Sequence, residues 1–166
     1  DKLEVFLSQI QGMMLVTGPT GSGKTTTLYS ILNHINQHER KIISIEDPVE
    51  MDIPRINQIQ ISELEQLTYA GALRACLRQD PDVILVGEIR DENTANIALR
   101  AAITGHLVLS TLHTSSTIST ILRLLNLDIA LSLLSDAIEI VIAQRLVKKL
   151  CFHCKKTVMP EDLNAL

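Results

Sequence analysis

With 166 residues, the chain is long enough to form one α/β domain with a substantial buried core. Hydrophobic residues make up 46% and charged residues 20% of the sequence, a composition that excludes an intrinsically disordered chain. The formal net charge of -4 argues against a surface that serves mainly to neutralise nucleic-acid phosphates or anionic lipid.

The first predicted strand, Met13 to Val16, leads into a complete phosphate-binding loop at residues 18–25, and a predicted helix follows at residues 25–38. Gly21 and Gly23 can adopt backbone angles closed to other residues, so that successive N–H groups point at phosphate oxygens. Lys24 neutralises phosphate charge, and the Thr25 hydroxyl can ligate Mg²⁺. The alternative, a glycine-rich turn that binds nothing, is disfavoured because every fixed position of the motif is filled. The predicted nucleotide-binding residues are Gly18, Pro19, Thr20, Gly21, Ser22, Gly23, Lys24, Thr25 and Thr26.

Three carboxylates, Glu46, Asp47 and Glu50, follow the second predicted strand, Ile42 to Ile45. Carboxylates at this spacing repel one another unless a metal ion or an arginine shares the site. The Mg²⁺ of a bound triphosphate can relieve this repulsion, which leaves one carboxylate to orient the attacking water. The alternative is a solvated acidic turn. Residues 51–67 are either a short strand or an excursion over the surface.

A helix predicted at residues 68–78 precedes the third strand, Val83 to Val86, which is followed by Glu88. Most phosphate-loop enzymes place an aspartate at such a strand end to hold the Mg²⁺ shell, and here Glu88 takes that place. In the alternative interpretation Glu88 forms a salt bridge with Arg90, and both arrangements are compatible.

Two histidines, His106 and His113, flank the fourth strand, Leu107 to Leu109, which follows a helix predicted at residues 93–104. A histidine at a strand end is more often structural than catalytic. Because two of them flank a strand of a predicted phosphate site, we expect at least one to contact the γ-phosphate or a neighbouring subunit.

After residue 118 the pattern predicts two or three helices up to Leu150. Residues 101–122 lack charged side chains, but their histidines, serines and threonines make them a poor membrane span, so no direct membrane insertion is expected. Three cysteines, an odd number, favour a reducing, cytoplasmic compartment. No signal-peptide pattern is visible at the N-terminus. Because the chain begins at Asp1 without a methionine and opens in a helix-like pattern, we expect a piece of a longer protein.

Strands and helices therefore alternate in the manner of an α/β protein with a doubly wound, mostly parallel sheet, which binds ligands at its carboxyl edge. We predict a nucleotide-binding core at residues 1–126 and a C-terminal helical segment at residues 127–166, with a partial Cys-x-x-Cys element at Cys151 and Cys154.

Five motifs in this order resemble the core ATPase domain of the type II secretion and type IV pilus assembly motors. They are GPTGSGKTTTLYS (18–30), IEDPVE (45–50), LRQDPDVILVGEIRD (77–91), TGHLVLSTLHT (104–114) and IAQRLVKKLCFHC (142–154). The resemblance covers nearly the whole chain and implies a RecA-like P-loop domain that hydrolyses ATP with Mg²⁺.

Residue roles also follow from this resemblance. It implies Glu50 as the water-polarising base, Glu46 and Asp47 as supporting acids, and Glu88 at the Mg²⁺ shell. His106 and His113 are implied as sensors near phosphate or the subunit boundary. The resemblance further implies a homo-hexameric ring in the cytoplasm, peripheral at the bacterial inner membrane under a platform protein.

Two departures from the family pattern are visible. The family's N-terminal domain, which covers the nucleotide and supplies arginines, lies outside this chain. Cys151 and Cys154 resemble half of a four-cysteine zinc element, and two thiolates cannot complete tetrahedral Zn²⁺, even with His153 as a third ligand.

Two functions of other classes stay open. A DNA-handling motor, such as a conjugation ATPase or ring helicase, shares the sheet but needs a basic groove with interleaved aromatics, and the basic residues 145–156 are accompanied only by Phe152. Nucleic acid is therefore not an expected partner. A non-hydrolysing, nucleotide-dependent scaffold would not need Glu50 and Glu88.

Overall fold

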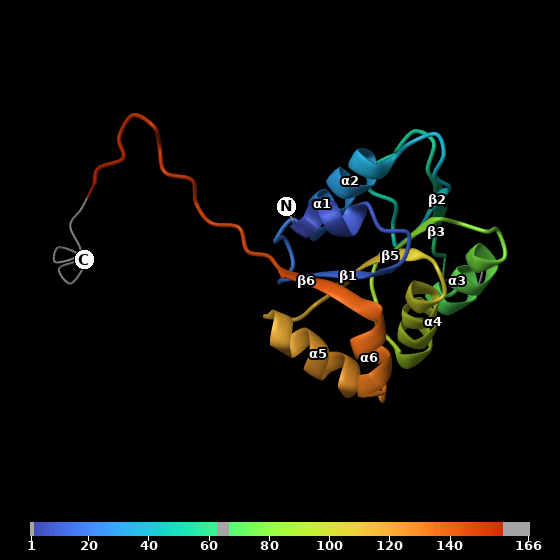
Figure 1. Ribbon diagram of the computed structural model, residues 1–166. Helices are drawn as coiled ribbons and strands as arrows, with labels where there is room; N and C mark the ends of the chain where they lie inside the picture. Colours follow the sequence, from blue (N-terminus) through green and yellow to red (C-terminus); the bar gives the residue numbers. More distant parts are fainter. Residues whose placement is uncertain (1, 63–66, 158–166) are drawn as a thin grey trace.

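A single six-stranded parallel sheet forms the centre of the molecule in the computed structural model, which describes residues 2–62 and 67–157. The strand order is β3-β2-β4-β5-β1-β6 (Figure 1). The strands are β1 (Gly12–Thr17), β2 (Ile42–Glu46), β3 (Asn57–Gln60), β4 (Val83–Val86), β5 (Leu107–Leu112) and β6 (Ile138–Ala143). The helices are α1 (Lys2–Leu7), α2 (Lys24–Ile35), α3 (Tyr69–Leu77), α4 (Glu92–Ile103), α5 (Thr117–Leu125) and α6 (Leu131–Ala137).

Helices cover both faces of the sheet, which is why its inner strands β2, β4, β5 and β1 are buried along their whole length. In β1, Met13 and Leu15 point into one core with α3 to α6, whereas Met14 and Val16 point into the other with α1 and α2 (Figure 1). All six residues of β1 are buried. The two cores fix β1 and therefore the position of the loop that follows it.

Side-chain caps set the start of α4 and α5. The Asp91 carboxylate accepts from Thr94 N at 2.9 Å at the start of α4, and Ser116 and Ser119 form a capping box at the start of α5. The predicted helices at 25–38, 68–78 and 93–104 are confirmed as α2, α3 and α4, with end points that differ by one to three residues. The doubly wound parallel fold is confirmed.

The prediction of helices from residue 118 to residue 150 is wrong beyond Ala137. Residues Ile138–Ala143 form β6, which pairs in parallel with β1, and no helix follows up to residue 157. Three isoleucines and a valine favour an extended backbone, and the edge of β1 supplies the hydrogen-bonding partner. The sheet of the core therefore extends past the predicted boundary between residues 126 and 127.

The structure also resolves the ambiguous segment at residues 51–67. Asn57–Gln60 form the short edge strand β3, which pairs with β2, whereas residues 51–56 are loop. Residues 63–66 lie outside the described part of the chain. No helix among the described residues is long and apolar enough to cross a membrane.

Candidate functional site

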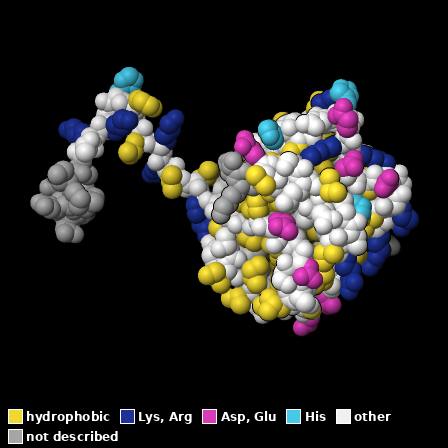
Figure 2. Space-filling view, viewed as in Figure 1, with side chains coloured by type: hydrophobic (Ala, Val, Ile, Leu, Met, Phe, Trp, Pro, Cys, Tyr) yellow, Lys and Arg dark blue, Asp and Glu magenta, His cyan; other side chains and the backbone are white. Residues whose placement is uncertain are grey.

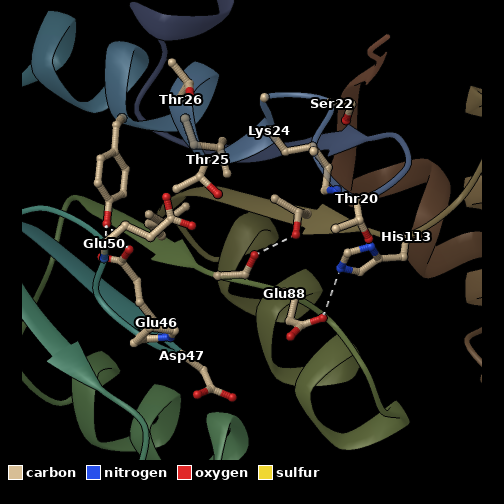
Figure 3. Close-up of a pocket in the computed structure, with 18 of the residues that line it drawn as sticks. Thr20, Ser22, Lys24, Thr25, Thr26, Glu46, Asp47, Glu50, Glu88 and His113 are labelled. Carbon is tan, nitrogen blue, oxygen red and sulfur yellow. Dashed lines mark hydrogen bonds and ion pairs between the residues drawn. The ribbon is translucent and has the colours of Figure 1, made fainter. Parts of the chain in front are cut away.

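A cavity of about 530 Å³ lies at the carboxyl edge of the sheet, where β2, β4 and β5 end beside the loop that follows β1 (Figure 3). Twelve of the predicted site residues line it: Thr20, Gly21, Ser22, Gly23, Lys24, Thr25, Thr26, Glu46, Asp47, Glu50, Glu88 and His113. The five others, Gly18, Pro19, His106, Cys151 and Cys154, do not. Segments as far apart in sequence as Thr20 and Leu146 thus meet around one cavity.

The phosphate-binding loop has the backbone conformation that its glycines predict. Gly18, Gly21 and Gly23 have φ values of 153°, 74° and 86°, in the region that favours glycine. The buried Lys24 ammonium donates to the carbonyls of Gly18 and Pro19 at 3.0 and 3.1 Å. Burial lowers the pKa of Lys24, and attraction to Glu88 partly opposes this shift. The loop therefore holds a cation at its centre that donates to two of the loop's own carbonyls.

Gly18 is also required by the space around it. A Cβ atom there would lie 2.4 Å from the Gln144 carbonyl oxygen and 2.5 Å from Ser22 Oγ. We expect Gly18→Ala in the full-length protein to lower the free energy of unfolding by about 1–3 kcal/mol, because overpacking adds to an unfavourable φ. Thermal unfolding measures the change.

Gly21→Ala is the matched control for this substitution, since a Cβ atom at Gly21 meets nothing within 4 Å. Its φ is also positive, so it tests the backbone cost alone. Equal destabilisation by both variants would show that contact with Gln144 and Ser22 is unimportant.

Gln144 holds the phosphate-binding loop from the other end of the chain, a role that the sequence did not predict. Its Nε2 donates to the Ser22 carbonyl at 2.7 Å, and its Oε1 accepts from Thr27 Oγ1 at 2.8 Å. Its backbone N–H donates to the Thr17 carbonyl, which continues the pairing of β6 with β1. Because residues 138–143 were predicted as helix, the sequence could not place Gln144 beside Ser22.

Glu46 is a buried carboxylate, 4% exposed, that lines the cavity at the end of β2. It accepts from Ser44 Oγ at 2.6 Å, from Gln58 Nε2 at 3.1 Å and from the Tyr29 hydroxyl. Three neutral donors thus replace the water that its charge loses on burial. Asp47 and Glu50, which follow it, are exposed.

Glu88, two residues after β4, forms the salt bridge with Arg90 that was one of the two arrangements expected for it, and its place at the Mg²⁺ shell stays a prediction. Its carboxylate pairs with Arg90 and lies 3.5 Å from His113 Nε2, an interaction drawn in Figure 3. Asp47 also lies 3.6 Å from the Arg90 guanidinium. The hydrogen bond to Glu88 is the main cause of the raised pKa of Arg90. Glu88 therefore forms a salt bridge and lines the cavity at the same time.

A family model described as type II/IV secretion system protein matches residues 1–166 of this sequence. The chain belongs to this family. The resemblance that the five sequence motifs indicated is therefore confirmed, and the RecA-like fold expected of the family is the fold observed here.

Relatives of this type II/IV secretion family chain include transport and pilus proteins. A protein transport protein HofB homolog of Escherichia coli is 60% identical over 150 residues, 90% of this chain and 32% of that protein. The type IV pilus assembly ATPase PilB of Pseudomonas aeruginosa is 53% identical over 159 residues, 94% of this chain and 28% of that protein. The chain thus spans about a third of the length of these relatives.

Among solved structures, the pilus retraction motor PilT with bound ADP superposes with a TM-score of 0.80 at 45% identity. The superposition covers 89% of this chain and 46% of that one. The family fold is therefore shared at a level that supports residue-by-residue comparison of the core.

The two histidines of this family member lie at opposite ends of β5. His113 follows the carboxyl end and lines the cavity, whereas His106 precedes the amino end, about 20 Å away for a six-residue strand. His106 Nδ1 lies 3.1 Å from the Ala101 carbonyl, near the end of α4. Contact of His106 with a phosphate in this cavity is thus not supported, and its place at a subunit boundary stays a prediction.

The donor set of the cavity fits magnesium that arrives with a nucleotide. Within residues 2–62 and 67–157, no three His, Cys, Asp or Glu side chains are grouped so that they hold a metal ion by themselves. Mg²⁺ in phosphate sites is bound through one or two protein oxygens together with substrate phosphates and water. The Thr25 hydroxyl and the Glu88 carboxylate, which line the same cavity, suit this mode.

Cys151 and Cys154 are both exposed on the segment that leads away from β6 (Figure 1). Backbone hydrogen bonds from Cys154 and His153 lower the pKa of the Cys151 thiol. The half zinc site stays a prediction, because residues 158–166, which follow, lie outside the described part of the chain.

Proposed function

We propose that this chain is the catalytic core of an ATPase that hydrolyses ATP to ADP and phosphate and so powers type II protein secretion or type IV pilus assembly. One observation carries the proposal: Lys24 and the phosphate-binding loop face the acids at the ends of two strands, β2 and β4, across a single cavity. The family match and the ATPase name of the pilus relative support it.

Binding of the nucleotide is assigned to the loop and the start of α2. Backbone N–H groups of residues 21–25 and the Lys24 ammonium bind the β- and γ-phosphates. Lys24 Nζ, which now donates to two loop carbonyls, exchanges them for phosphate oxygens. Thr25 and Glu88 hold Mg²⁺, which supplies charge neutralisation on the phosphates.

Hydrolysis is assigned to the acids on the opposite wall. Glu50, an exposed carboxylate that lines the cavity, orients water for in-line attack on the γ-phosphate. Glu46 and Asp47 support the loop that carries Glu50. His113, beside Glu88, contacts the γ-phosphate in the triphosphate state alone, and loss of this contact changes the domain arrangement.

The ring architecture is part of the same proposal. We infer a homo-hexamer at the cytoplasmic face of the bacterial inner membrane, docked on a platform protein. Apolar side chains gather over α5 in Figure 2, and Ile118 and Leu122 of this helix are exposed by 73 and 54%. An exposed apolar group of this kind supports contact between subunits.

Magnesium removal tests the proposed hydrolysis. In the full-length protein we expect Mg-ATP to bind in a calorimetric titration and phosphate release to fall to background with EDTA. Activity returns when Mg²⁺ is restored, because the metal neutralises the developing charge. Absence of Mg-ATP uptake by folded full-length protein, or phosphate release that EDTA leaves unchanged, contradicts the proposal.

A further inference from the structure

Tyr29 joins the nucleotide-binding helix α2 to the acidic loop, the segment after β2 that carries Asp47 and Glu50, on the opposite wall of the cavity. It lies in α2, five residues after Lys24, and is 5% exposed. Its hydroxyl donates to Glu46 Oε2 and accepts from the backbone N–H of Glu50 at 3.2 Å. Because a phenol has one proton and the carboxylate only accepts, this direction of both hydrogen bonds is fixed.

The hydroxyl keeps its proton over the physiological range. Burial, together with the hydrogen bond to the Glu46 carboxylate, raises the pKa of Tyr29 to about 12. Tyr29 therefore remains a donor to Glu46 and an uncharged acceptor for the Glu50 amide whenever the protein is folded at neutral pH.

Side chains of β3 hold the same acidic loop from its other side. Gln60 Oε1 accepts from Val49 N at 3.2 Å, and Gln58 Oε1 accepts from Ile53 N at 2.7 Å. Residues 49–53 are thus held between β3 and α2, and Tyr29 of α2 contributes a contact with the Glu50 amide. The Glu50 side chain is exposed, so its orientation depends on how firmly its own backbone is held.

We propose that Tyr29 is a positioning residue for hydrolysis, which acts by fixing the backbone of Glu50 relative to the helix that binds the phosphates. The inference rests on the proposed function, in which Glu50 orients the attacking water. Lys24 and Tyr29 belong to one helix, so α2 sets both the phosphate position and the position of the Glu50 loop. A misplaced catalytic group reduces turnover without weakening binding of the nucleotide.

The Tyr29→Phe substitution in the full-length protein removes only the hydroxyl oxygen and its proton. We expect kcat for ATP hydrolysis to fall about tenfold, while KM and the Kd for Mg-ATP stay within about twofold. In a Glu50→Gln background, Tyr29→Phe lowers kcat no further, because the residue through which it acts is already lost.

Ser44→Ala is the matched control, because it also removes one donor to the buried Glu46, whereas the Glu50 amide donates to Tyr29. It separates loss of stability from loss of positioning: both variants lower the midpoint of thermal unfolding, and Tyr29→Phe alone lowers kcat about tenfold. An equal loss of kcat in both variants, or an undiminished effect of Tyr29→Phe in the Glu50→Gln background, overturns the inference.

The proposed function and this inference fail in different ways. If the parent protein hydrolyses ATP, Glu50→Gln does not, and Tyr29→Phe matches the parent, only the role of Tyr29 is refuted. If the parent does not hydrolyse ATP, or Glu50→Gln hydrolyses it as fast as the parent, the function itself is refuted and the role of Tyr29 with it.

Discussion

Lys24→Ala in the full-length protein is expected to raise the Kd for Mg-ATP about 10- to 100-fold, because a charge-assisted hydrogen bond to phosphate is lost. We expect kcat to fall about 100-fold or more, since the same cation stabilises charge that develops on the transferred group. Lys24 is buried at the centre of the loop, and the other described side chains that line the cavity include no lysine or arginine. Calorimetric titration and phosphate release measure the two effects.

Lys41→Ala provides the charge-matched control. Lys41 is exposed and lies before β2, at the amino edge of the sheet, where its ammonium donates to the Gln79 carbonyl. We expect this variant to bind and hydrolyse ATP as the parent does. A Lys24→Ala protein that binds and turns over like Lys41→Ala would falsify the assignment of the cavity to phosphate.

Glu50→Gln is expected to separate binding from chemistry. The amide has the shape of the carboxylate but not its charge or basicity, so we expect kcat to fall about 100-fold or more. The Kd for Mg-ATP should stay within about twofold, because Glu50 is assigned to water rather than to the nucleotide. Single-turnover phosphate release and equilibrium binding of Mg-ATP measure both quantities.

The control for Glu50→Gln is Glu39→Gln, which removes an exposed carboxylate in the loop between α2 and β2. We expect it to leave turnover unchanged. Parallel losses of kcat in the two variants would point to net charge as the cause. A nucleotide-dependent scaffold predicts no phosphate release from the parent protein, and thus no difference for Glu50→Gln to reveal.

The phosphate-binding loop and its neighbouring acids could be predicted because their chemistry is local in sequence. The glycines of residues 18–25 dictate the loop conformation, and Glu46 and Glu88 each follow a short apolar run by at most two residues. Parallel strands then bring those run ends to the same edge, so the cavity follows from the strand pattern alone. Strand β4 has the predicted ends, Val83–Val86.

The contacts that hold this cavity in shape could not be predicted in the same way. Tyr29, Gln58 and Gln144 each bridge elements that only the folded chain brings together. The sequence pattern of residues 138–143 is compatible with an apolar helix as well as with a strand. These residues form a strand because they pair with β1 in the folded chain. His106 was grouped with His113 because both flank one strand. The two residues nevertheless lie at opposite ends of that strand, so only one of them reaches the cavity.

Pairing of β6 with β1 has a practical consequence for anyone who shortens this protein. A fragment that stops before Ile138 would leave the backbone of β1 without a neighbour on one side, next to the nucleotide loop. Such a bare strand edge is a template for self-association and precipitation. The smallest unit suitable for recombinant production therefore extends through Gln144, whose amide group also anchors Ser22.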